Sequence, residues 1–455
     1  MAGIGFELRK VIGKGGLGSF LKAALSGTMI VAGPWLLSIV GITLIYNFTD
    51  LALQQNAGLF IAPVVYTYAF SLILFSGPHF LLTRIIADQI FDRRFRDAAA
   101  TLIAAIIGVG VVAAGIAVLG LVLLGPFPLA NEPLYCAAAV VLFVTVNIIW
   151  LIMLFISILK EYSRILLAFA FGLAVSVVLA AVLSGALGLA GALVGFTIGH
   201  VVIAALLLYL GLRAYAPGSL RRQLPAFADY LRRYLPLVLA GALYNWGIWA
   251  DKIVYWFLQG DAVAGTGFLL NDAYDLAVYF GTLSMVPGLV YFIVFSETSV
   301  YILLRKMLTA LGSRTFGEIQ RRKTRLLRGI RRAVVDQSIF QGVVTLSLVL
   351  AAPLLAGALT GGVVTATVFA VTLTAVFTHL LLLTLLNLQF YMEIYDGALA
   401  SALTFFTVNT GLSFFLGATP GLSYLIGGAA GAVVAGVVLH RGTTRLDRRI
   451  LAGVG

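Results

Sequence analysis

Long apolar runs separated by short polar segments make up this chain from about residue 24 to residue 440. Each run holds about 20 residues or more, which is the helix length that crosses roughly 30 Å of hydrocarbon. The pattern predicts about twelve transmembrane helices, near 24–47, 59–85, 98–124, 135–159, 163–183, 187–212, 233–258, 273–297, 333–357, 362–386, 396–416 and 420–440. We therefore expect an all-α polytopic membrane protein, which agrees with a composition of 61 % hydrophobic residues.

A polar segment at 213–232, which contains Pro217, Gly218 and Pro225, interrupts this pattern after the sixth predicted helix. Proline and glycine mark breaks in regular structure, so this segment is the predicted linker between two six-helix lobes, 23–212 and 233–442. An even number of helices gives both lobes the same orientation, as in transporters built from parallel repeats. Residues 1–22 mix basic and apolar positions and predict an amphipathic helix on the membrane surface, and 443–455 form a short tail.

Basic residues are distributed unevenly, and their positions predict the orientation of the chain. Thirty lysines and arginines stand against 18 acidic residues, and all of the basic ones except Lys252 fall at the termini or in segments on the same side of the membrane as the N-terminus. By the positive-inside rule both termini and the basic segment 300–332 are cytoplasmic. The charge therefore indicates topology and contact with membrane lipids rather than nucleic acid. A docking surface for a cytoplasmic partner at 300–332 is the alternative.

Residues 244–256 place five aromatic side chains and two charges inside the seventh predicted helix. At helical spacing Asn245, Trp249, Lys252 and Trp256 share one narrow face, and Tyr244, Asp251 and Tyr255 share the neighbouring face. A charge at mid-membrane costs about 3 kcal/mol, so such residues usually face the protein interior or a watery cavity. The pattern predicts a polar, aromatic-lined cavity. The alternative is an aromatic belt with the Lys252 ammonium reaching the headgroups.

The eighth predicted helix carries further intramembrane charges. Asp272 and Asp275 lie at its outer end, Tyr279 shares a face with Asp275, and Glu297 lies near its cytoplasmic end. Matching depth predicts that Lys252 pairs with Asp275, or failing that with Asp272. Asp251 and Lys252 point about 100° apart, which makes them poor partners in this interpretation. Predicted helix breaks at Pro34, Pro78 and Pro287 would place their helices against the protein interior, where the freed carbonyls find partners.

The same inventory argues against an enzyme. Cys136 is the only cysteine, which excludes disulfides within the chain and cysteine-based metal clusters. The four histidines lie in separate predicted helices, and no loop is long enough for a nucleotide-binding domain. We therefore expect no metal and no cofactor. The chemistry that remains is binding and passage, and flat aromatic rings suit the apolar face of a sugar ring.

Four stretches of the chain form a recognisable set: Met1-Ala-Gly-Ile-Gly-Phe-Glu-Leu-Arg-Lys10, Gly33-Pro34-Trp35-Leu36-Leu37-Ser38, Phe75-Ser76-Gly77-Pro78 and Tyr244-Asn245-Trp246-Gly247-Ile248-Trp249-Ala250-Asp251-Lys252. Together they resemble the PelG family, the inner-membrane transporters of the Pel exopolysaccharide system. The resemblance covers essentially the whole chain and implies the MATE/polysaccharide flippase superfamily, with two six-helix lobes around a V-shaped cavity. It also implies movement of a growing chain rich in N-acetylgalactosamine from cytoplasm to periplasm. The implied partners are a cytoplasmic glycosyltransferase and membrane proteins that include a cyclic-di-GMP receptor.

On this interpretation the polysaccharide path follows an aromatic and amide face of the seventh and eighth helices. Its expected members are Tyr244, Asn245, Trp249, Tyr255, Trp256 and Tyr279. A cation-coupled exporter of small molecules or lipid-linked sugars is an alternative, made less favourable because the first six predicted helices carry no carboxylate at mid-depth. A non-transporting scaffold that recruits a synthase is a third possibility, and it predicts that cavity substitutions leave export intact.

Overall fold

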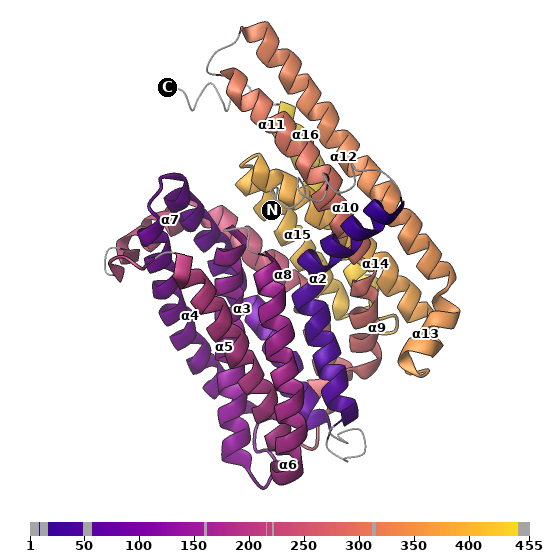
Figure 1. The fold of residues 1–455 in the computed structure, drawn as a ribbon. Helices are drawn as coiled ribbons and strands as arrows, with labels where there is room; N and C mark the ends of the chain where they lie inside the picture. Colours follow the sequence, from indigo (N-terminus) through magenta and orange to yellow (C-terminus); the bar gives the residue numbers. More distant parts are fainter. Residues whose placement is uncertain are drawn as a thin grey trace. The chain divides into compact units, whose positions relative to one another are not determined.

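The computed structural model describes residues 9, 17–48, 57–158, 162–214, 216–220, 223–311 and 315–444, and this part of the chain is almost entirely helical (Figure 1). This confirms the all-α fold class. The first helices in order are α2 (Leu17–Phe48), α3 (Gly58–Phe91), α4 (Phe95–Leu124), α5 (Glu132–Ile158), α6 (Tyr162–Ala214), α7 (Gln223–Arg233) and α8 (Leu235–Gln259). Most of the predicted amphipathic segment 1–22 and of the tail 443–455 lies outside the described residues.

A two-stranded antiparallel ribbon, β1 (Asp261–Ala262) and β2 (Leu269–Leu270), follows α8. The remaining helices are α9 (Asp272–Leu283), α10 (Val286–Tyr291), the π-helix η3 (Phe292–Glu297), α11 (Thr298–Leu311), α12 (Phe316–Leu350), α13 (Ala352–Thr360), α14 (Ala366–Tyr391), α15 (Tyr395–Ser413) and α16 (Leu422–Thr444). Each predicted transmembrane range lies mainly on helix. Within the described residues eight helical segments are both long and apolar enough to cross a membrane, so the count of twelve stays a prediction.

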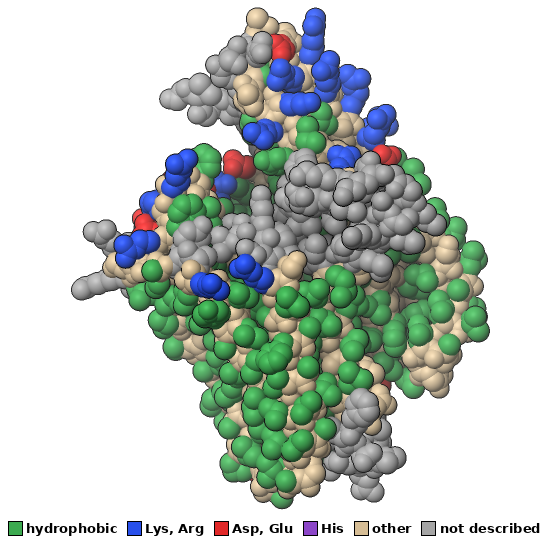
Figure 2. All heavy atoms as spheres, in the orientation of Figure 1, with side chains coloured by type: hydrophobic (Ala, Val, Ile, Leu, Met, Phe, Trp, Pro, Cys, Tyr) green, Lys and Arg blue, Asp and Glu red, His purple; other side chains and the backbone are tan. Residues whose placement is uncertain are grey.

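On the face drawn in Figure 2, hydrophobic side chains cover the long sides of the helices, and Lys and Arg side chains gather near helix ends and along α12. The exposed apolar side chains include Val111, Val122, Phe171, Val182 and Val343, each more than half exposed. In a soluble protein such a surface would cause association, whereas in a bilayer it faces hydrocarbon. The distribution is the one expected of a multi-pass membrane protein.

The chain divides into two compact units. The N-terminal unit comprises Ala32–Asn245 and Gly260–Leu270, and the C-terminal unit comprises the described parts of Met1–Val31, Trp246–Gln259 and Asn271–Gly455. The unit boundaries therefore fall inside α2 and α8. The predicted linker 213–232 contains most of α7, an amphipathic helix of the N-terminal unit whose Tyr230 hydroxyl donates to the Asp88 carboxylate at 3.1 Å.

Close helix contacts build the N-terminal unit. Helix α6 changes direction at Gly188, whose φ of 60° and ψ of −140° place it in a region that only glycine adopts easily. The halves on either side of this bend pack together through Gly195, where an added Cβ would lie 2.6 Å from the Cα of Ala180. Small residues allow this approach, as in other membrane helix pairs. The two ranges predicted at 163–183 and 187–212 correspond to these halves.

In the C-terminal unit, α9, α10, η3 and α11 follow one another with little interruption. Pro287 lies in the first turn of α10, where its missing N–H would have no helical partner in any case. Pro78, by contrast, lies inside α3, which continues to Phe91, and Pro34 lies within the bounds of α2. The predicted helix breaks at these two prolines are therefore wrong, because a membrane helix can continue past the one hydrogen bond that a proline removes. Helices α11 and α12 then form a hairpin and run side by side in Figure 1, with Met307, Leu326 and Ile330 buried at their contact.

Candidate functional site

Two oppositely charged side chains, Asp251 and Lys252, are buried next to each other on α8 in the C-terminal unit. Asp251 is fully buried and Lys252 is 3 % exposed, and the ammonium Nζ lies 3.1 Å from Oδ1 and 3.3 Å from Oδ2 of the carboxylate. The ammonium also donates to the carbonyl oxygen of Ile248 at 2.7 Å. Lys252 therefore lies in the protein interior and does not reach toward headgroups.

The predicted pairing of Lys252 with Asp275 is wrong. The Asp275 carboxylate instead accepts the Trp256 indole N–H at 2.8 Å and the backbone N–H of Asn271 at 3.1 Å. The helical angle between adjacent residues fixes only the Cβ directions, and the four-carbon stem of lysine bends back far enough to meet its neighbour. Asp272, the second predicted partner, is exposed at the start of α9.

Two further groups from distant helices hold the Asp251 carboxylate. The Tyr274 hydroxyl donates to Oδ2, and the Asn409 side-chain amide donates to Oδ1 at 3.2 Å and to the Gly247 carbonyl at 2.8 Å. The carboxylate thus receives three side-chain donors, from Lys252, Tyr274 and Asn409. Such full satisfaction is what a buried ion pair needs in order to offset its loss of hydration.

Aromatic rings cover the ammonium. Lys252 Nζ lies 4.2 Å from the ring centroid of Tyr424 and 5.8 Å from that of Tyr274, both within the range of a cation–π contact. We call Asp251, Lys252, Tyr274, Asn409 and Tyr424 the charge-pair cluster. It ties together α8, α9, α15 and α16, and its cation is supplied by the chain itself.

Local sequence explains why these groups meet. The Asn271 side chain caps α9 by accepting the backbone N–H of Tyr274 at 3.1 Å, which fixes Tyr274 in the first turn. Gly247 lets α15 approach α8 closely, since an added Cβ would lie 2.6 Å from Phe405. Asn409 and Tyr424 were missed from the sequence. The available signal was a lone amide inside the apolar range 396–416 and a tyrosine near the start of the last predicted helix.

The expected path residues fall into two groups in the structure. Tyr244, Tyr255 and Trp256 are buried, and Tyr255 shares a hydrogen bond of 3.1 Å with Ser423. Asn245 and Trp249 are partly exposed. The Trp249 and Trp256 rings lie 6.4 Å apart, so these two positions share a face of α8 as the spacing predicted, and Tyr279 on α9 is also partly exposed. A role in a path stays a prediction for all six residues.

The last predicted intramembrane charge, Glu297, ends the π-helix η3 and is 2 % exposed. Its carboxylate accepts the hydroxyl of Tyr391 from α14. Among the described residues, no three His, Cys, Asp or Glu side chains come close enough together to hold a metal ion. Through its hydrogen bond with Tyr391, Glu297 makes a second buried contact between helices of the C-terminal unit.

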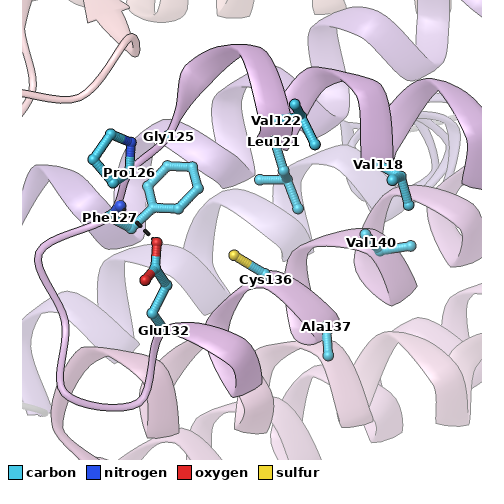
Figure 3. A pocket seen from close by; sticks show the side chains of 10 residues that line it. All are labelled: Val118, Leu121, Val122, Gly125, Pro126, Phe127, Glu132, Cys136, Ala137 and Val140. Atoms are coloured by element: carbon cyan, nitrogen blue, oxygen red, sulfur yellow. Dashed lines mark hydrogen bonds between the residues drawn. The ribbon is translucent and has the colours of Figure 1, made fainter.

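A depression of about 530 Å³ lies in the N-terminal unit between the ends of α4 and α5 (Figure 3). Its lining is mostly apolar, with Val118, Val122 and Val140 on one side, and the Glu132 carboxylate at its edge accepts the Phe127 backbone N–H at 2.9 Å. Val118 and Val122 are among the exposed apolar side chains that face hydrocarbon. The depression belongs to the lipid-facing surface, so it is a poor candidate for a polar substrate.

In a comparison with sequence models of protein families, the model of the PelG exopolysaccharide exporters (EPS-E) matches residues 1–450. The chain belongs to the PelG family. Membership confirms the resemblance drawn from the sequence, and a comparison with curated proteins finds no match.

Solved structures show the fold. The chain is similar to a MATE transporter in the bent conformation, with 15 % identity, a TM-score of 0.58 and coverage of 95 % of this chain and 97 % of that one. It is also similar to a MOP superfamily transporter from Pyrococcus furiosus, with 17 % identity, a TM-score of 0.57 and coverage of 94 % and 96 %. An inward-facing multidrug MATE transporter matches at 16 % identity with a TM-score of 0.55, covering 89 % and 94 %. This PelG family member is a multi-pass membrane protein with a MATE-like transporter fold.

Proposed function

We propose that this PelG family member exports a growing Pel-type exopolysaccharide, rich in N-acetylgalactosamine, from the cytoplasm to the periplasm across the bacterial inner membrane. The family match over residues 1–450 supports the polysaccharide, and the MATE-like fold supports passage through a membrane. A protein with this role binds and releases its substrate without chemical change, so we infer that it is not an enzyme. A cytoplasmic glycosyltransferase and a membrane-bound cyclic-di-GMP receptor are the proposed partners, as supplier and regulator of the chain.

The proposed polysaccharide path is supported by one observation, the partial exposure of one face of α8. Trp256 is buried and donates its indole N–H to Asp275, so its ring is not accessible to a substrate. The neighbouring ring of Trp249, 6.4 Å away, is partly exposed and can be contacted by a substrate. Asn245, one turn before Trp249, is partly exposed as well. A sugar ring can stack on the indole and bond to the amide, and many weak contacts of this kind suit a polymer that must keep advancing.

Truncation of Trp249 tests this path. We expect Trp249→Ala to reduce export about 2- to 13-fold, since a lost stacking contact of about 0.5–1.5 kcal/mol corresponds to that range, and Trp249→Phe to retain part of the activity. The measurement is secreted polysaccharide per cell at equal protein level. Phe257→Ala is the matched control, because Phe257 lies on the same helix and is 76 % exposed.

Two results decide against the path. Normal export by both Trp249→Ala and Asn245→Ala would place the polymer elsewhere. Equal losses in Trp249→Ala and Phe257→Ala would show that any aromatic truncation on α8 disturbs the protein, which would remove the evidence for stacking.

The proposed orientation has its own test. After Cys136→Ser, we expect a cysteine at Ser313 to resist a membrane-impermeant thiol reagent in intact cells and to react once the membrane is opened, because the basic segment 300–332 favours the cytoplasm. A cysteine at Ala418, an exposed position in the connection between α15 and α16, should react in intact cells. Labelling of Ser313→Cys from outside would reverse the assigned topology.

A further inference from the structure

Helix α12 carries two kinds of surface along its 35 residues. Its second half exposes a row of apolar side chains at spacings of three and four residues, formed by Val335, Ile339, Val343, Leu346 and Leu350. A row of this kind on one face of a membrane helix faces lipid. The hydrocarbon boundary therefore lies near Val335.

The first half of α12 and the helix α11 that packs on it are strongly basic. Residues 298–332 contain ten lysines and arginines and one acidic residue, Glu318, which Arg322 engages. Arg305, Lys306 and Arg321 are exposed, and within the described part of the chain no carboxylate pairs with any of them. Three cations without an internal partner leave a surface that attracts anionic groups.

The three cations lie too far from the membrane surface to be attracted strongly by lipid headgroups. Arg321 precedes Val335 by 14 residues, which is about 21 Å along a helix at 1.5 Å per residue. A tilt of 40° reduces the height above the hydrocarbon to about 16 Å, and the headgroup layer takes up roughly 5–8 Å of it. The remaining gap is about one Debye length, ~8 Å, even at this extreme tilt, and it widens for a steeper helix. Headgroup attraction at Arg321 is therefore largely screened.

Arg305 and Lys306 lie near the height of Arg321, within the length of one arginine side chain, because the Arg322 guanidinium donates to the carbonyl oxygen of Lys306 at 2.7 Å. Arg331 and Arg332, in contrast, are only three or four residues from Val335, about 5–6 Å along the axis, where headgroups are within reach. The hairpin thus has a membrane-proximal basic pair that suits lipid and a distal basic surface, formed by Arg305, Lys306 and Arg321, that does not.

The hairpin holds the distal surface in place. Met307, Ala310, Leu326 and Ile330 are buried in the seam between α11 and α12. Gly329 allows the close approach, since an added Cβ would collide with the side chain of Leu303. A surface built on packed helices loses less conformational entropy on binding than a flexible loop would.

We propose that the distal basic surface docks the acidic face of a soluble cytoplasmic protein. Guanidinium groups bind carboxylates through paired hydrogen bonds, and Leu308, which is 52 % exposed beside Arg305 and Lys306, adds the apolar contact common in protein interfaces. The stretch 317–332 contains no aromatic side chain on which nucleic-acid bases could stack. The proposal depends on the cytoplasmic orientation given above and on no particular substrate.

Site-specific photo-crosslinking in intact cells tests the docking. A benzoylphenylalanine at Thr324, which is exposed on the basic half of α12, should crosslink to a protein segment rich in Asp and Glu, whereas the same probe at Ile339, 62 % exposed in the apolar row, should crosslink to lipid. We expect Arg305→Gln/Lys306→Gln/Arg321→Gln to lower the Thr324 crosslink about tenfold. The control Arg328→Gln/Arg331→Gln/Arg332→Gln removes the same charge nearer the membrane and should change it less than twofold.

Charge exchange completes the test. Lysine at the crosslinked acidic residues of the partner should lower the wild-type crosslink, and Arg305→Glu/Lys306→Glu/Arg321→Glu should restore it. Crosslinks from Thr324 to lipid or to RNA, or a distal variant that crosslinks as wild type does, would overturn the docking surface. Because the readout is the crosslink and not secreted polymer, these outcomes are independent of the Trp249 result.

Discussion

Asp251→Asn is expected to destabilise the protein by about 3–5 kcal/mol, the cost of leaving a buried charge without its counter-charge. In the structure Lys252 is 3 % exposed and its ammonium meets one carboxylate, that of Asp251. The asparagine keeps the shape and can still meet Asn409 or Tyr274, so the loss reports the charge and not a cavity. Thermal unfolding of the purified protein in detergent measures it.

The double variant Asp251→Asn/Lys252→Met separates the charge from the packing. It removes both charges and keeps most of both side-chain volumes, and pairs of this kind are often replaced without loss of stability. We expect it to recover most of the stability that Asp251→Asn loses. If Asp251→Asn unfolds at the wild-type temperature, the ammonium has another partner and the charge-pair cluster does not hold these helices together.

Gly195→Val is expected to disrupt the N-terminal unit at a cost of about 3 kcal/mol, the upper end of the usual range for overpacking. The new Cβ would lie 2.6 Å from the Cα of Ala180, and a backbone atom cannot move aside as a side chain can. The two halves of α6 would have to separate, which would lower the yield of monodisperse protein after detergent extraction.

Gly185→Val is the matched control for this substitution. Gly185 lies in the first half of α6, is exposed, and has open space where a Cβ would point. We expect a change within about 0.5 kcal/mol, as for other exposed substitutions. Equal losses at the two positions would attribute the effect to a bulky β-branched side chain anywhere on α6 and not to contact between the helix halves.

Helix positions were predictable from this sequence because hydrocarbon thickness imposes one length on every spanning helix. The ranges 59–85, 98–124 and 362–386 each match a single helix, α3, α4 and α14, with ends that differ by at most six residues. The break between 183 and 187 came close to the bend of α6 at Gly188. The composition of an apolar segment does not show where the helix that contains it begins. Helix α12 begins at Phe316, well before the predicted residue 333, and its first half contains much of the basic segment.

The partners in the charge-pair cluster were not predictable in the same way. A helical wheel relates residues of one helix, and it correctly placed Trp249 and Trp256 on one face. Asn409 and Tyr424 come from helices more than 150 residues later in the chain, and their contact with Asp251 and Lys252 depends on how α15 and α16 pack against α8. The Lys252 side chain is also long and flexible, so the spacing of residues along the helix does not determine where its ammonium group lies.

The adjacency of Asp251 and Lys252 also bears on the response of the C-terminal unit to membrane voltage. One elementary charge that crosses 100 mV gains or loses about 2.3 kcal/mol. Here the two opposite charges belong to neighbouring residues and lie about 3 Å apart, 3.1 Å between Nζ and Oδ1. Any movement of α8 carries both together, so the electrical work on one cancels the work on the other. The pair therefore contributes almost no gating charge. The membrane potential does no net work on Asp251 and Lys252 when the unit moves, so these two charges neither drive nor oppose that movement.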